Sequence, residues 1–151
     1  MSEGATVRLV DDHLLLRVLL GDEPSGLDVS GAASIATTGL WYHRLCRALA
    51  DDRVVGALSG QIGSVDPAVA QATIAALVDL PEGVTLVSLR DLAWPMAELV
   101  SDGTRLNLLS LEALAAAQHL DATICLAAAD ENPPLVAAAQ AADVPIRVVE
   151  G

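Results

Sequence analysis

The sequence predicts a single α/β domain in which strands alternate with helices around a parallel sheet, and three observations carry this prediction. The chain has 151 residues, the usual size of one domain, and no linker or low-complexity segment divides it. Hydrophobic residues make up 53% of the sequence, with no Phe, two Trp and one Tyr, so an aliphatic core is expected. Short apolar runs alternate with longer helical patterns, which is typical of right-handed βαβ crossovers with helices on both faces of a sheet.

In the first half of the chain, helix- and strand-breaking residues and helix-capping residues separate these elements. Gly and Pro interrupt the apolar runs, and Ser, Thr or Asp precede the helical ones. The expected elements are a strand at residues 7–10, a helix at 13–20 that ends before Gly21, a loop at 21–34, a helix at 39–50 capped by Thr37 or Thr38, and a helix that begins at Asp66-Pro67 and ends near Leu80.

The second half repeats the alternation. The run at residues 84–88 is continuously apolar, as expected for a strand that is buried on both faces. The remaining expected elements are a helix at 90–100 interrupted at Pro95, a helix that Ser110 caps and that ends near Leu120, a strand at 122–127, a polar turn at 130–134, a helix at 135–142 and a strand at 146–149.

The charge of the chain excludes some classes of function. The chain contains twenty acidic residues, eight Arg and no Lys, which gives a net charge of -12. This charge argues against a general nucleic-acid-binding module with a basic face. An enzyme that holds one RNA strand through metal ions and a few Arg is still compatible with this charge. No apolar run is long enough to span a membrane, the start of the chain lacks a basic and apolar export signal, and Cys46 and Cys125 are expected to be reduced. A cytoplasmic location is therefore expected.

Acidic side chains follow two of the expected strands. Asp11 and Asp12 follow the first, Asp130 follows the third, and Glu112 lies in the first turn of the helix that Ser110 is expected to cap. Ligands bind beyond the carboxyl ends of parallel strands, and a cluster of carboxylates suits Mg²⁺ or Mn²⁺. The alternative is that acids such as Asp12 and Glu112 only compensate the positive ends of helices.

Two stretches resemble a known family. Leu9-Val10-Asp11 precedes an aliphatic helix that runs into Leu19-Leu-Gly-Asp-Glu-Pro24, and Ser110-Leu-Glu-Ala-Leu-Ala-Ala-Ala-Gln-His-Leu-Asp-Ala122 precedes a strand, Asp130, and the closing Val144-Pro-Ile-Arg-Val-Val149. The order resembles PIN domains, the nuclease fold of VapC-type toxins. The resemblance covers residues 1–151 and implies a three-layer α/β/α domain with a central, mostly parallel sheet.

The resemblance also implies a catalytic and metal-binding site that uses Mg²⁺ or Mn²⁺. Its first acid matches Asp11, and its fourth matches Asp130, although the usual Thr two residues before is missing. The third acid matches Glu112 if the nearest carboxylate is taken, whereas a strict alignment places Ser110 there. Asn132 lies in the same rigid turn as Asp130, before two Pro residues, and either helps the site or only caps the next helix.

The second acid of the family has no counterpart in this chain. Residues 38–47 contain no acid, and Arg44 stands where the Glu is expected, with His43 beside it. Arg44 is expected either to pair with the remaining carboxylates, such as Asp11 and Asp130, and compete with the metal, or to contact a phosphate together with His43. The first outcome would leave no resident metal.

Two functions follow from the resemblance, and a third does not depend on it. The first is a PIN-like protein with weakened or lost nuclease activity that acts through a regulatory protein, an antitoxin or a homodimer. The alternative is a Mg²⁺- or Mn²⁺-dependent endoribonuclease of the VapC toxin type, which would bind single-stranded RNA and pair with an antitoxin. The third is a small-molecule-binding or phosphatase-like α/β domain.

The aromatic residues have structural explanations as well as functional ones. Trp41 and Leu45 are four residues apart on one expected helix, which favours core packing for Trp41 over base stacking. Trp94 is expected to pack beside the Pro95 kink, with a binding surface as the alternative.

Overall fold

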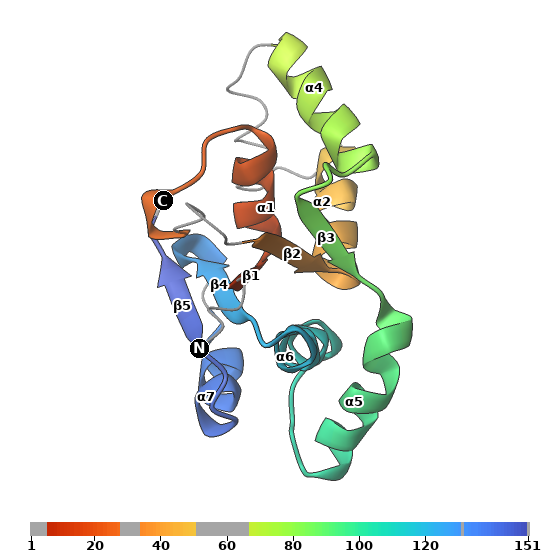
Figure 1. Ribbon diagram of the computed structural model, residues 1–151, viewed down its shortest axis with the longest axis vertical. Coiled ribbons are helices and arrows are strands. Elements are labelled where there is room, and N and C mark those ends of the chain that lie inside the picture. Colours follow the sequence, from red (N-terminus) through yellow and green to blue (C-terminus); the bar gives the residue numbers. More distant parts are fainter. Residues whose placement is uncertain (1–5, 28–33, 51–66, 131, 151) are drawn as a thin grey trace.

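The computed structural model describes residues 6–27, 34–50, 67–130 and 132–150. Five strands and six α-helices alternate within these ranges, together with two short 3₁₀ turns, η1 (Ser25–Leu27) and η2 (Ala128–Asp130) (Figure 1). The strands are β1 (Val7–Val10), β2 (Ser34–Thr38), β3 (Val84–Val87), β4 (Thr123–Ala127) and β5 (Ile146–Val149). The helices are α1 (Asp12–Leu19), α2 (Gly39–Ala50), α4 (Pro67–Val78), α5 (Leu89–Ser101), α6 (Leu108–Leu120) and α7 (Pro133–Ala141).

The described strands form one parallel sheet in the order β3-β2-β1-β4-β5. The chain enters at the central strand β1, adds β2 and β3 on one side, and then adds β4 and β5 on the other. Leu9 in β1 is therefore aligned with Ala36 in β2 and with Ile124 in β4. This arrangement confirms the α/β fold and creates a switch point between the carboxyl ends of β1 and β4, where open parallel sheets bind ligands.

Helices cover both faces of the sheet and give a three-layer α/β/α architecture. Figure 1 shows α1 and α4 toward one end of the view and α5, α6 and α7 toward the other. Each face has its own apolar cluster, because aliphatic side chains alternate between the two faces of the strands. Helix α2 contributes to both, with Leu45 in the α1 cluster and Trp41 in the α6 cluster. The core packing predicted for Trp41 is confirmed, since only 2% of its surface is exposed.

Helix α6 is the most deeply buried helix of the apolar cluster that contains Trp41, and its composition explains why. It packs against α5, α7 and three strands, and its side chains from Ser110 to Ala117 are all buried. Alanines allow neighbouring elements to approach closely without leaving voids. The helix begins earlier than predicted, because the side chain of Asn107 accepts a hydrogen bond from Ser110 N at 2.8 Å and acts as N-cap. Ser110 is thus inside the helix, and Glu112 lies beyond its first turn.

Two strands differ from the prediction. The segment at residues 34–38 was expected to be the end of a loop and a helix cap, but it forms the buried strand β2. Its Thr side chains suit this position, because Thr37 donates to Val10 O at 2.9 Å and Thr38 accepts from Trp41 N at 3.2 Å, the predicted cap of α2. The expectation that residues 84–88 are buried on both faces is wrong, since β3 is an edge strand and Leu86 is 42% exposed.

The helices that contain Trp94 and Pro67 also differ from the prediction made from the sequence. Helix α5 continues through Pro95, and Trp94 projects to solvent with 74% of its surface exposed instead of packing. Helix α4 ends at Val78, two residues before the expected end, and its predicted cap Asp66 lies outside the described residues. Within the described part of the chain, no helix combines the length and the apolar character needed to cross a membrane.

Candidate functional site

Asp11 follows β1 and joins three elements at the switch point. Its Oδ1 accepts a hydrogen bond from Leu14 N at 2.9 Å, which caps α1, and its Oδ2 accepts one from Ala127 N at 2.8 Å, at the end of β4. The side chain is fully buried. Burial raises the pKa of Asp11 to about 7, and the two backbone hydrogen bonds only partly oppose this rise. Asp11 therefore connects β1, α1 and β4 through both of its oxygens.

Asp12, the next residue, forms the ionic centre of the site with Arg44 from α2. Arg44 Nε donates to Asp12 Oδ2 at 2.5 Å, and Arg44 Nη2 donates to Asp12 Oδ1 at 2.7 Å. The same Nη2 donates to Asp130 Oδ2, so the guanidinium bridges the carboxyl ends of β1 and β4. Asp12 is fully buried, whereas the side chains of Arg44 and Asp130 are 38% and 35% exposed. The hydrogen bond to Asp12 is the main reason that the pKa of Arg44 lies above its ordinary value.

Glu112 reaches the start of α2 from the buried helix α6. Its Oε1 accepts a hydrogen bond from Leu40 N at 2.9 Å, and its Oε2 lies where a Cβ at Gly39 would be 3.6 Å away. A carboxylate at the first turn of a helix satisfies free N–H groups and is stabilised by the positive end of the helix. The observed contact of Glu112 is thus a capping contact between two helices.

Ser110 and Asn132 connect α6 to the turn that carries Asp130. Asn132 Nδ2 donates to Ser110 Oγ at 2.7 Å, and Asn132 Oδ1 accepts from Leu135 N at 3.3 Å as the N-cap of α7. The pair links the start of α7 to the buried helix. This contact positions the polypeptide two residues after Asp130.

Comparison with known proteins identifies the fold. No protein-family model and no curated protein matches the sequence. A chain of the VapBC2 structure from Rickettsia felis, bound to a DNA fragment from their promoter, is similar with 10% identity and a TM-score of 0.55, over 95% of this chain and 99% of that one. A chain of VapBC-1 from nontypeable Haemophilus influenzae has 12% identity and a TM-score of 0.51, over 95% and 98% of the two chains. The chain has a PIN-like fold of the VapC type.

The fold brings some of the expected site residues together, but one of the expected ion pairs is formed with a different residue. Arg44 does pair with Asp130, but its second partner is Asp12 and not Asp11. This difference arises because both oxygens of Asp11 are already bonded to backbone N–H groups. His43, next to Arg44, is an exposed residue of α2. The sequence placed Asp12 among the acids after the first strand, with a helix-end role as the alternative, but did not name it as the partner of Arg44.

His13 is a further residue of the candidate site that the sequence did not single out. Its Nδ1 is buried without a hydrogen-bond partner, and ligand atoms of Asp12, His13 and Asp130 lie within 4.8 Å of one another. This set of donors would suit a divalent cation in isolation. In the observed arrangement the set does not fit one, because the guanidinium of Arg44 already binds both carboxylates and a metal ion would be repelled by it.

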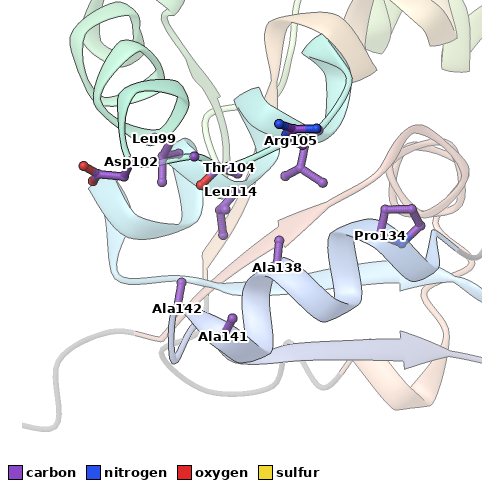
Figure 2. Close-up of a pocket in the computed structure, with 11 residues that line it drawn as sticks. Leu99, Asp102, Thr104, Arg105, Leu114, Pro134, Ala138, Ala141 and Ala142 are labelled. Carbon is purple, nitrogen blue, oxygen red and sulfur yellow. The ribbon is translucent and has the colours of Figure 1, made fainter.

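A second concave region of the PIN-like chain lies away from these acids. A hollow of about 350 Å³ opens between the α5–α6 loop and α7 (Figure 2). Figure 2 shows Thr104 and Arg105 on one side of it, and Ala138, Ala141 and Ala142 on the other. The hollow exists because α7 presents alanines, whose side chains fill little space. Its lining is mainly aliphatic, apart from residues such as Asp102, Thr104 and Arg105, and contains none of the acids at the switch point.

Proposed function

We propose that this PIN-like protein has lost metal-dependent nuclease activity and acts by binding a protein partner. The observation that carries the proposal is the Arg44 guanidinium, which joins buried Asp12 to Asp130 at the switch point. In the resemblance drawn from the sequence, this position belongs to an acidic metal ligand. Arg at the same position reverses the charge and supplies an internal cation that cannot be deprotonated in a protein.

Entry of Mg²⁺ or Mn²⁺ would have a high energetic cost at this site. The ion would have to displace two hydrogen bonds between Arg44 and Asp12 and one to Asp130, each strengthened by charge. The displaced guanidinium would still be attached to α2, close to the dication, and would repel it. The net charge of -12 additionally disfavours the approach of RNA at long range.

The proposed partner is a protein related in role to an antitoxin. The two solved chains described above belong to complexes whose names, VapBC2 and VapBC-1, describe an assembly, which supports a protein-binding role for the fold. In this proposal the protein acts in the cytoplasm. The alternative function, a Mg²⁺- or Mn²⁺-dependent endoribonuclease, is favoured by the grouping of Asp12, His13 and Asp130 and is the competing outcome of the experiment.

Calorimetric titration with Mn²⁺, together with RNA cleavage assays, tests the proposal. Wild-type protein should show neither Mn²⁺ binding at sub-millimolar concentrations nor metal-dependent cleavage of single-stranded RNA. Arg44→Glu should gain Mn²⁺ affinity by roughly tenfold or more, because it replaces the internal cation by a carboxylate between Asp12 and Asp130. Arg47→Glu is the matched control, since it makes the same charge change at an exposed position of the same helix and should gain none.

Two results would contradict loss of activity. One is tight Mn²⁺ binding by the wild-type protein that disappears in Asp12→Asn. The other is cleavage of RNA by the wild-type protein that requires Mg²⁺ or Mn²⁺ and is abolished by the same substitution. Either result would overturn the proposal, and the second would establish the endoribonuclease alternative.

A further inference from the structure

Arg8 in β1 is a buried cation that pairs with no acid of the described residues. Only 9% of its surface is exposed, and its Nε is buried with no hydrogen-bond partner in the described part of the chain. Its Nη1 donates to Thr123 Oγ1 at 3.4 Å, which is a long contact with a neutral hydroxyl. Arginine is rarely buried to this extent unless an anion compensates its charge, so the burial of Arg8 requires a further partner.

The Nε side of the guanidinium is the part of Arg8 that is open to an oxyanion. The N–H groups at Nε and Nη2 of an arginine point in the same direction and fit two oxygens of one carboxylate or phosphate group. Arg44 uses this pair of donors to bind both oxygens of Asp12. In Arg8 the Nε donor has no acceptor among the described residues, and the contact with Thr123 is made by Nη1. Arg8 therefore has the geometry to bind one bidentate oxyanion.

The surroundings of Arg8 add a hydroxyl and a second cation. Arg8 is aligned with Thr123 in β4, and Cys125 in β4 is aligned with Arg147 in β5, so all these side chains lie on the sheet face that α1 covers. Arg147 Nη1 donates to Gly26 O at 3.2 Å, which holds this side chain near the sheet. Burial raises the pKa of the Cys125 thiol to about 11, and the guanidinium groups of Arg147 and Arg8 oppose this rise. Both cations therefore lie close to the same thiol.

We propose that Arg8, together with Thr123 and Arg147, binds a phosphate group near the amino ends of β1, β4 and β5. Nε and Nη2 of Arg8 would each donate to a phosphate oxygen, and the Thr123 hydroxyl, which accepts from Arg8, keeps its own proton to donate. A phosphate monoester carries a charge of about -1.5 to -2 at neutral pH, so it compensates two guanidinium groups better than one carboxylate does.

The ligand that fits this position is small. The net charge of -12 disfavours long polyanions, so inorganic phosphate or a small phosphate monoester is expected. Strand β5 is at the edge of the sheet and Arg147 is exposed, so the phosphate group can be reached from solvent on that side. The acids of the switch point lie at the opposite, carboxyl ends of the strands. The inference therefore does not rest on the absence of nuclease activity, and the two proposals can fail independently.

Calorimetric titration and urea denaturation of the full chain with inorganic phosphate, at constant ionic strength set by chloride, test this inference. Phosphate at about ten times its measured dissociation constant should lower the unfolding equilibrium constant of the wild-type protein about tenfold. Acetate should stabilise less, because it carries a single charge. A higher affinity for phenyl phosphate than for phosphate would assign the site to a monoester, and a lower one to the free ion.

Arg8→Met removes the guanidinium and should abolish the effect of phosphate. Without phosphate this variant should be at least as stable as the wild-type protein, because it removes an uncompensated buried charge. Thr123→Val keeps this charge and should weaken phosphate binding, and Arg147→Met should weaken it at least about threefold by removing the second cation. Arg90→Met is the matched control at an exposed position of α5 and should leave phosphate binding within about twofold of wild type.

Circular dichroism should confirm that these variants are folded, and Thr123→Val decides the test if Arg8→Met is not. A wild-type protein whose stability does not respond to phosphate would overturn the inference. Stabilisation by phosphate that survives in Arg8→Met would also overturn it, as would equal stabilisation by acetate and phosphate.

Discussion

Truncation of Arg44 to Met should reveal how strongly the buried carboxylate of Asp12 depends on its guanidinium. Met retains most of the apolar stem of Arg but removes two hydrogen bonds to Asp12 and one to Asp130. Removal of one partner from a fully buried ion pair costs about 3–5 kcal/mol of stability, because it leaves a buried charge without compensation. Asp12 is fully buried, but the Arg44 side is 38% exposed and water can partly replace it. The free energy of unfolding should therefore fall by about 2–3 kcal/mol.

A double-mutant cycle measured by urea denaturation separates the ion pair from the loss of packing. Asp12→Asn should cost about 1–2 kcal/mol, since Arg44 keeps Asp130 and solvent as partners. The double variant should be more stable than the sum of the two single effects predicts, by about 1–2 kcal/mol, because neither charge is then left alone. Additive effects, or a cost below about 0.5 kcal/mol for Arg44→Met, would refute the view that Arg44 neutralises this site.

Two further predictions concern the other buried acids. Burial raises the pKa of Asp11 from 3.8 to about 7, so the folded chain holds a proton that the unfolded chain releases at lower pH. The free energy of unfolding should therefore decrease as pH rises from about 4 to about 7 and level off above that. Asp11→Asn should remove this pH dependence in urea titrations across the range. Glu112→Ala should lower the free energy of unfolding by about 1–2 kcal/mol, because Leu40 N loses its acceptor. Glu112→Gln keeps an oxygen at this position and should lower the free energy of unfolding less. Equal effects of the two variants in urea denaturation would show that the cap is unimportant.

Local sequence signals predicted most helices and strands because those elements are marked by local chemistry. Thr38 before α2 and the turn after Asp130 are short-range signals that survive in the structure, and the strand at Ile146–Val149 has the predicted bounds. Strand β2 was missed because Ser34–Thr38 has only one large apolar side chain, and its burial comes from β1 and β3 on either side. The exposed face of β3 was also missed, since edge position is a property of the whole sheet. The exposure of Trp94 was missed because the side of α5 that packs depends on how the helix lies against the rest of the fold.

The candidate site, like the fold, was predicted from the sequence only in part. The sequence placed acids after β1 and before α7 and an Arg in α2, and it gave pairing of this Arg with carboxylates as one possibility and contact with a phosphate as the other. It named Asp11 as one of these partners, which is wrong, because Asp11 and Asp12 are adjacent in the chain but have different partners. Asp11 is bonded to the backbone of α1 and β4, and Asp12 to Arg44. His13 was not considered, because a histidine at the start of a helix has no local signal for proximity to Asp130, more than a hundred residues later.

The sequence by itself determined the alternation of aliphatic strands and helices, the strong negative charge, and the presence of Arg44 at the position where the resemblance to PIN domains implies an acid. These properties depend on residues close together in the chain or on composition. Only the tertiary structure decided that β1 and β4 are neighbours, that Asp12 is buried, and that one guanidinium spans Asp12 and Asp130. Such contacts form when the sheet brings distant strand ends together, so the same Arg44 can be identified from the sequence, but its role as the internal cation of the site follows from the packing.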